Sequence, residues 1–140
     1  MAGDFQSRDE EFMREALDLA FESMDLGEVP VGALIVIDGK VVGRGGNRCI
    51  GNLDPTAHAE IIALRDASKF LGNYRLPGAE LFVTLEPCTM CVGAIIHARI
   101  KRVVFAALDS RSGAVCSCSK TFDQKHHNHY VEWAHGLLAE

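Results

Sequence analysis

The chain has 140 residues, of which 48% are hydrophobic and 24% are charged, a balance typical of a globular protein. This length suits one domain, and we expect a single domain over residues 1–140. The formal net charge of −5 disfavours a broad polyanion-binding surface, because contacts with phosphate groups need local positive charge. No run of about 18 apolar residues is present, so we predict no membrane span.

The cysteine content and the N-terminal segment both bear on the cellular compartment. Five cysteines are an odd number, which fits a reducing compartment better than a framework of disulfide bonds. The first 15 residues include seven charged side chains, where a secretory signal peptide would need an apolar stretch. We therefore expect a cytoplasmic protein.

The first third of the chain predicts one helix and a β-hairpin. Apolar residues recur at helical spacing from Arg8 to Gly27, which indicates a helix with one apolar face. Residues 31–37 are a continuous apolar run, typical of a strand buried on both faces. Asp38-Gly39 is a tight-turn signal, and residues 40–45 are expected to return as the partner strand. The expected apolar face of the helix consists of Met13, Leu17, Ala20, Phe21 and Met24.

A second helix is predicted after a loop at residues 46–57. Asp54-Pro55-Thr56 has the features of a helix start, since a short polar side chain precedes a proline. His58 and Glu60 are then expected in the first turn, and Gly72 ends the helix.

The rest of the chain indicates an α/β fold. Residues 80–85 and 102–107 read as strands, and Pro87 between them opens a helix. Alternation of strand, helix and strand favours parallel pairing of the two strands. Residues 110–129 are polar and irregular, with room for one short helix, and residues 130–133 are expected to form a last strand.

Three residues from two predicted helix starts form a candidate zinc site. Cys88 and Cys91 are three residues apart and share one face of a helix, and His58 supplies a third ligand. The positive end of a helix favours thiolates. A tetrahedral zinc ion held by three protein groups keeps its fourth position for water, which is the catalytic arrangement. We expect one zinc ion per chain, with Glu60 as the catalytic residue that moves protons.

Other histidines, cysteines and basic residues leave alternatives open. Cys116 or Cys118 could complete a structural four-ligand site, although Glu60 would then have no task. Clustered histidines in a polar loop are more often solvated than ligating, so we expect no second metal at His126, His127 and His129. The basic residues Arg99, Lys101 and Arg102 fit either a solvated face or a phosphate contact.

The two halves of the candidate site match a known signature. His58-Ala59-Glu60 and Pro87-Cys88-Thr89-Met90-Cys91 correspond to the H-x-E…P-C-x-x-C pattern of zinc nucleobase deaminases. The chain resembles the cytidine deaminase superfamily and, more narrowly, the bacterial tRNA-specific adenosine deaminases. The narrower resemblance is carried by residues 73–76, 97–100 and 128–132.

This resemblance implies a fold, a reaction and partners. The implied fold has three α/β/α layers around a mixed five-stranded sheet, and the implied reaction converts the wobble adenosine of a tRNA anticodon to inosine. The implied partners are an anticodon stem-loop and a second copy of the chain in a homodimer. The family continues into a basic C-terminal helix, so we expect that residue 140 falls before that helix. By resemblance, the substrate-binding residues are Val31, Asn47, Leu85, Ala107, Leu108, Asp109, Asn128 and His129.

Two other classes of function remain open at this stage. One is a deaminase of a free base or nucleoside, of the guanine or cytosine type. The other is a binding module that zinc stabilises and that has no activity. The sequence does not indicate which tRNA would be the substrate.

Overall fold

A mixed five-stranded sheet lies at the centre of the computed structural model, which describes residues 6, 8–124 and 129–138. The strand order is β2-β1-β3-β4-β5. β1 pairs antiparallel with β2 and β3, whereas β3, β4 and β5 run parallel. The predicted parallel pairing of residues 80–85 with 102–107 is confirmed. The strands are β1 (Gly32–Ile37), β2 (Lys40–Gly46), β3 (Glu80–Leu85), β4 (Arg102–Ala107) and β5 (Glu132–His135).

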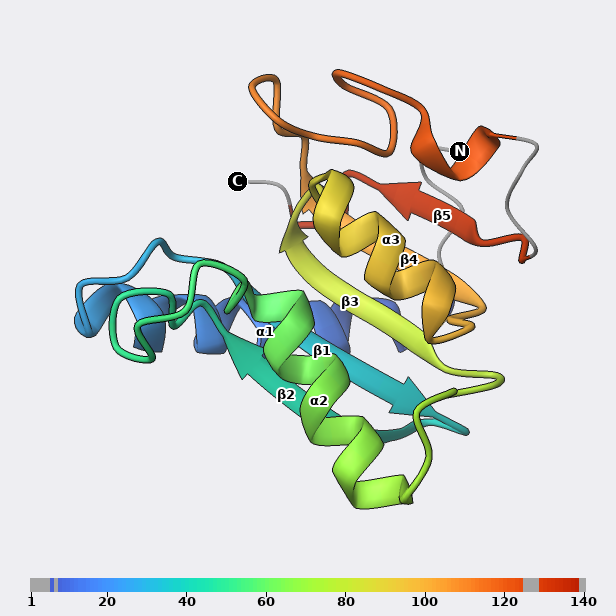
Figure 1. Ribbon diagram of the computed structural model, residues 1–140, viewed down its shortest axis with the longest axis horizontal. Helices are drawn as coiled ribbons and strands as arrows, with labels where there is room; N and C mark the ends of the chain where they lie inside the picture. The colour runs from blue at the N-terminus through green and yellow to red at the C-terminus, as the bar shows by residue number, and fades with distance from the viewer. Residues whose placement is uncertain (1–5, 7, 125–128, 139–140) are drawn as a thin grey trace.

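Helices cover both faces of the sheet. α2 (Ala59–Leu71) and α3 (Thr89–His97) lie side by side on one face, and α1 (Asp9–Asp25) covers the other (Figure 1). A short 3₁₀ helix, η1 (Thr121–Asp123), precedes β5. Leu81 and Val83 belong to the core beneath α2 and α3, whereas Phe82 packs with α1, because neighbouring strand residues point to opposite faces. The predicted three-layer α/β/α fold is confirmed.

Among the residues that the structure describes, no helix is both long enough and apolar enough to cross a membrane.

The predicted apolar face of α1 is wrong in part. Phe21 and Met24 are 56% and 51% exposed, whereas Phe12 and Ala16 are buried. Phe12 packs against Phe82 on the sheet, with ring centroids 5.2 Å apart. Ala16 lies where α1 approaches Gly32 at the start of β1. The buried stripe of α1 therefore runs through Phe12, Ala16 and Ala20, and not through Phe21 and Met24.

Three predicted boundaries also shift. α2 begins at Ala59, so His58 is its N-cap residue and does not lie in the first turn. The Asp54 carboxylate accepts hydrogen bonds from Thr56 N at 2.9 Å and from Thr56 Oγ1 at 2.7 Å, which closes a separate local turn before the helix. α3 likewise begins at Thr89 after Cys88 as N-cap. The last strand spans Glu132–His135 instead of 130–133.

Arg102 has a structural role and is not a phosphate contact. Its guanidinium group is almost fully buried and forms ion pairs with Asp9 at 2.6 Å and Glu80 at 2.9 Å. These bonds join the start of α1 to β3 and β4. Breaking such a buried pair by removing one partner typically costs about 3–5 kcal/mol. Lys101 is exposed.

Candidate active site

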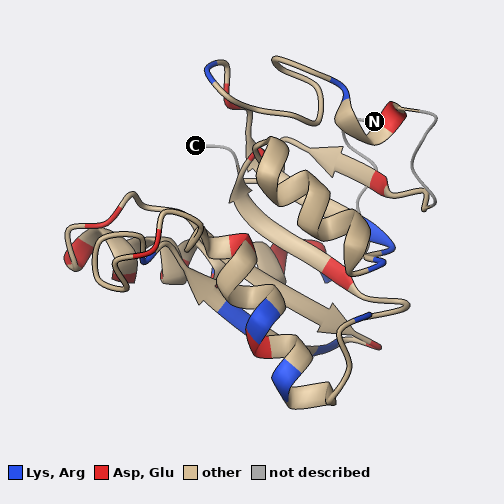
Figure 2. Ribbon diagram, in the orientation of Figure 1, with Lys and Arg blue, Asp and Glu red and all other residues tan. Residues whose placement is uncertain are grey.

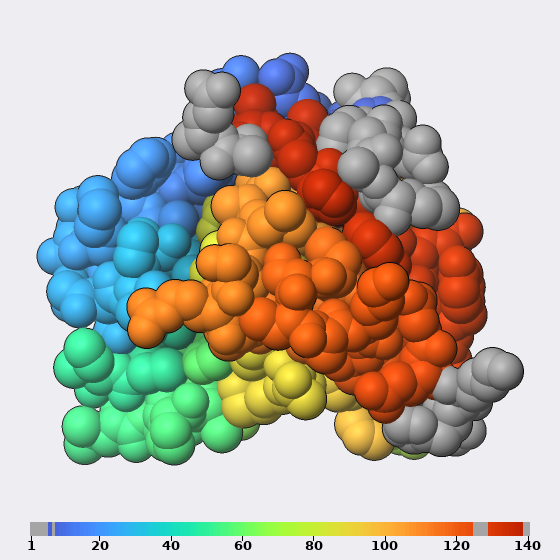
Figure 3. All heavy atoms as spheres, turned by 90° about the horizontal axis from the view of Figure 1, so that it is seen from above, coloured from blue at the N-terminus to red at the C-terminus, as the bar shows by residue number. Residues whose placement is uncertain are grey.

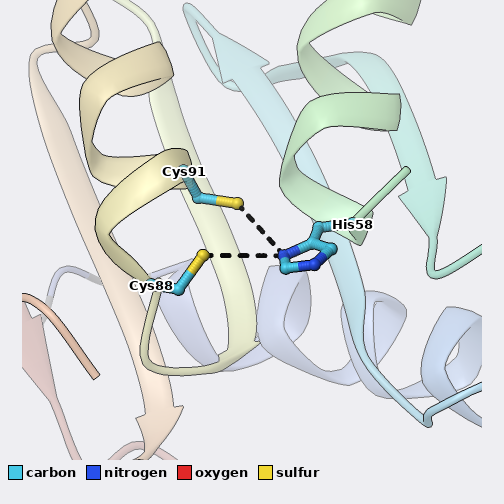
Figure 4. A group of neighbouring side chains, drawn as sticks. All are labelled: His58, Cys88 and Cys91. Atoms are coloured by element: carbon cyan, nitrogen blue, oxygen red, sulfur yellow. Dashed lines mark hydrogen bonds between the residues drawn. The ribbon is translucent and has the colours of Figure 1, made fainter. Parts of the chain in front are cut away.

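The starts of α2 and α3 lie at the same edge of the sheet. His58 is the N-cap residue of α2 and Cys88 is the N-cap residue of α3, and both have extended backbone conformations. Neither side chain forms a hydrogen bond that caps its own helix. Both side chains therefore remain free to face one another across the gap between the helices, as Figure 4 shows.

The three predicted ligands meet at one point. His58 Nδ1 lies 3.6 Å from Cys88 Sγ and 3.6 Å from Cys91 Sγ (Figure 4). A tetrahedral zinc ion with Zn–S of about 2.3 Å and Zn–N of about 2.05 Å would hold nitrogen and sulfur donors about 3.6 Å apart. The donor set, one imidazole and two thiols, also suits zinc. The geometry and the chemistry of these residues therefore fit one zinc ion.

No fourth protein donor joins this group within the described residues. The cluster of His, Cys, Asp or Glu atoms that lie within 4.8 Å of one another consists of His58, Cys88 and Cys91. Cys118 is exposed and its thiol donates to Ser110 O at 3.2 Å. A three-donor site leaves one tetrahedral position for a small ligand.

The hydrogen bond between the two thiols shifts their pKa values in opposite directions. A hydrogen bond from the Cys91 thiol lowers the pKa of Cys88 to about 5, and the same bond raises the pKa of Cys91. Zinc binds thiolates, so loading the site releases the proton of Cys91.

Glu60 is a buried carboxyl group beside this cluster. It lies in the first turn of α2 and is 4% exposed. Burial raises the pKa of Glu60 to about 7. A carboxyl group with a pKa near neutrality both accepts and donates protons readily at physiological pH.

A pocket of about 350 Å³ opens over the cluster and Glu60. This volume lies at the lower end of the range for small-molecule sites, roughly 300–1,000 Å³. Four of the predicted substrate-binding residues line the pocket, namely Val31, Asn47, Leu85 and Asp109. Asn47 is 7% exposed, so its polar side chain is placed at the pocket wall and not in bulk solvent.

Three other predicted substrate-binding residues do not line this pocket. Ala107 contributes its carbonyl oxygen, which accepts the Glu86 N–H at 2.9 Å. Leu108 is 52% exposed. His129 Nε2 lies 2.6 Å from the carbonyl oxygen of Ile100, before the start of β4 and at the opposite edge of the sheet. Asn128 lies outside the described residues, as do His126 and His127.

Two buried glutamates at the pocket were not predicted. Glu28 accepts the N–H groups of Ile50 at 3.1 Å and Gly51 at 2.7 Å, which holds the loop between β2 and α2. Glu86 binds the loop after β4 in a similar way. Burial raises the pKa of Glu86, but the N–H groups that the carboxylate accepts outweigh this effect and lower it. Neither role has a local signal in the sequence, although each glutamate begins a segment that the resemblance includes, Glu28-Val29-Pro30-Val31 and Glu86-Pro87-Cys88.

The comparisons with known proteins agree with this geometry. Residues 6–107 match the family model of the cytidine and deoxycytidylate deaminase zinc-binding region. The tRNA-specific adenosine deaminase of Haemophilus influenzae is 54% identical over 133 residues, which are 94% of this chain and 77% of that protein.

Two solved structures extend the comparison. A structure from studies of A-to-I editing by tRNA:A34 deaminases at the wobble position of transfer RNA has a TM-score of 0.90 and 46% identity, over 93% of this chain and 100% of that chain. Guanine deaminase from Bacillus subtilis has a TM-score of 0.71 and 37% identity, over 88% and 82% of the two chains. The chain belongs to the zinc-binding cytidine and deoxycytidylate deaminase family and, within it, to the tRNA-specific adenosine deaminases.

Proposed function

We propose that this protein is a zinc-dependent hydrolase that converts the wobble adenosine of a tRNA anticodon to inosine. The observation that carries the proposal is the meeting of three zinc donors, 3.6 Å from nitrogen to each sulfur, with the buried carboxyl group of Glu60. In this proposal His58, Cys88 and Cys91 hold the metal and Glu60 is the catalytic residue. The relatives that act on tRNA support the choice of substrate.

The reaction consumes one water molecule and releases ammonia. When bound, zinc supplies Lewis-acid chemistry that lowers the pKa of water from 15.7 to about 7. Glu60 accepts the proton of the attacking water and delivers it to a ring nitrogen of the purine as the water oxygen adds to C6. Glu60 then takes the second proton of the added oxygen and protonates the amine as the C6–N bond breaks. One carboxyl group therefore serves every proton transfer.

The pocket walls support a substrate that remains attached to a polymer. Val29 and Ile50 line the pocket and are 61% and 68% exposed, so apolar side chains continue from the pocket onto the surface. The C6 atom of a base that is stacked in a helix is not accessible to the active site. The adenosine must therefore lie in a loop and turn out of the stack into the pocket. We propose that Asn47 hydrogen-bonds the turned-out nucleotide and that Val31, Leu85 and Asp109 shape the pocket around it.

Zinc-loaded protein should form inosine in an anticodon stem-loop that contains a wobble adenosine, and should leave adenosine, guanine and cytidine unchanged. The likeness to a guanine deaminase makes free guanine the main competing substrate. The measurement is chromatography of nucleosides after digestion of the stem-loop, with a stem-loop carrying guanosine at the wobble position as control. Deamination of free guanine without reaction of the stem-loop would reject this proposal.

We also propose that the enzyme is a homodimer and that α2 and α3 contribute to its interface. A groove of about 540 Å³ runs between the outer surfaces of these helices. It is lined by apolar side chains, which include Ile61, Leu64 and Ala94, and by two basic ones, Arg65 and Lys69. Tyr74 lies at this groove and is 73% exposed. Figure 2 shows basic and acidic residues side by side on α2, so this helix lacks the continuous positive charge that binding along a phosphate backbone needs.

Sedimentation equilibrium at micromolar concentration should give the mass of two chains. Tyr74→Glu should raise the dissociation constant of the dimer by about 10-fold or more, because a charge replaces an exposed aromatic ring at the groove. Phe70→Glu is a matched control, since Phe70 is 72% exposed on α2 but does not line the groove. A wild-type protein that sediments as a monomer would contradict the proposal.

We place the enzyme in the cytoplasm. None of the five cysteines forms a disulfide bond, which suits a reducing compartment.

A further inference from the structure

We propose that Glu86 is a positioning residue that sets the wall of the active-site pocket by holding the loop of residues 108–117. This inference rests on the proposed function, because it concerns how the same pocket receives its nucleotide. Glu86 directly follows β3, two residues before the predicted ligand Cys88, and is 2% exposed. Figure 3 shows the segment after β4, in orange, spread over the face of the molecule seen from above.

The carboxylate of Glu86 accepts five hydrogen bonds from this one loop. Oε1 accepts the N–H of Asp109 at 3.1 Å and the hydroxyl of Ser117. Oε2 accepts the N–H groups of Val115 at 3.0 Å, Cys116 at 2.8 Å and Ser117 at 2.9 Å. A carboxylate has about four acceptor positions, so these donors fill the hydrogen-bonding capacity of the group. Hydrogen bonds to an ionised acceptor are roughly twice as strong as neutral ones.

The loop is shaped around the carboxylate at Gly113. A methyl group at this position would overlap the Glu86 carboxylate and lie 2.6 Å from Asp109 O. Gly113 N donates to Asp109 O at 2.9 Å, and Ala114 N donates to Pro87 O at 2.8 Å. The loop therefore closes on Glu86 and on the residue after it, next to the start of α3.

The same loop supplies two residues of the pocket wall. Asp109 and Ser112 line the pocket. The Asp109 carboxylate accepts the N–H of Ser112 at 3.2 Å and its hydroxyl at 3.0 Å, so Asp109 and Ser112 move as one unit. Since Glu86 holds the N–H of Asp109, the position of both wall residues depends on the Glu86 carboxylate. Glu60 and the predicted zinc donors lie on or directly before α2 and α3, whereas Asp109 and Ser112 lie on the loop itself.

Glu86→Gln should raise KM for the anticodon stem-loop about 10-fold and change kcat less than about 3-fold. An amide has one accepting oxygen, so in either orientation at least one backbone N–H of the loop faces an NH₂ group that cannot accept. One lost acceptor in a buried site corresponds to roughly this factor, and a rise in KM with kcat unchanged identifies a loss of binding that the ground state and the transition state share. Gly113→Ala should reproduce the effect with Glu86 intact.

Trypsin cleavage after Arg111 gives a readout that does not need activity. Arg111 is exposed in the loop, and cleavage of a native protein follows local opening of the cleaved segment. Cleavage after Arg111 should be about 10-fold faster in Glu86→Gln than in the wild type. Asp9→Asn is the matched control, because Asp9 is equally buried but binds Arg102 on α1's side of the sheet. It should lower the melting temperature without raising KM or cleavage after Arg111.

The outcomes separate this inference from the proposed function. A wild type that leaves the stem-loop unchanged would reject the proposed function, while the cleavage assay would still decide the role of Glu86. Wild-type KM and wild-type cleavage in Glu86→Gln would overturn the inference. Loss of zinc from this variant with unchanged cleavage would also overturn it, because Glu86 would then act on Cys88 and not on the loop.

Discussion

Replacement of Glu60 with glutamine should lower kcat on the stem-loop by about 10²–10⁴-fold or more, the range that a general acid–base residue contributes. Glutamine matches the volume of a side chain that is 4% exposed, so the fold and the pocket should remain. The amide cannot take a proton from water or give one to the leaving amine. Single-turnover kinetics with saturating enzyme would measure the chemical step directly.

Three measurements make the Glu60→Gln result specific. Metal analysis should give one zinc ion per chain, as in the wild type, and fluorescence anisotropy should give an unchanged dissociation constant for the stem-loop. Glu28→Gln is the matched control, since Glu28 lines the same pocket and is 6% exposed but holds a loop. Its kcat should fall less than about 10-fold. If Glu60→Gln kept full turnover, the proton-transfer role would be refuted, and a wild type without turnover would favour the zinc-stabilised binding module.

Four of the strands and the cluster of proposed zinc donors were predictable because their signals are local. The continuous apolar run at residues 31–37 predicts a strand that is buried on both faces, and β1 spans Gly32–Ile37. His58, Cys88 and Cys91 were singled out from residue type and spacing, since few residue types bind zinc, and from their match to the signature of zinc nucleobase deaminases. Their meeting point, however, requires two helices to start at the same sheet edge. This follows because β1 is antiparallel to both β2 and β3, so the ends of β2 and β3, which precede α2 and α3, lie at the same edge.

The roles of Glu28 and Glu86 were not predictable from local patterns. Their carboxylates bind N–H groups that lie 22 to 31 residues further along the chain. Such bonds depend on where two loops arrive after folding, and no spacing rule encodes that arrival. His129 is the opposite case. The family-like segment around it predicted a place near the substrate, whereas its ring lies against Ile100 O at the far edge of the sheet. The predicted start of α2 was wrong because Asp54 accepts a hydrogen bond from Thr56 N and closes a separate turn before the helix.

Replacement of Cys91 with alanine should reduce the zinc content far below one ion per chain and abolish turnover. Cys91 is fully buried, so water does not easily replace the missing thiolate, and two remaining donors hold zinc weakly. Because metal binding stabilises the folded state by mass action, the melting temperature should fall as well. Chelation of the wild type should give the same loss, and added zinc should restore wild-type activity but not the activity of Cys91→Ala.

Two further cysteine variants test how many protein donors the metal has. Cys116→Ala and Cys118→Ala should each keep one zinc ion and near wild-type kcat, because neither thiol joins the cluster of three donors among the described residues. In a structural four-ligand site, one of these two variants would lose zinc as readily as Cys91→Ala does. Such a loss would mean that a cysteine thiolate, and not water, occupies the fourth metal position in the wild type. Glu60 would then have no water to deprotonate, so the zinc content of these two variants decides whether the metal can take part in hydrolysis.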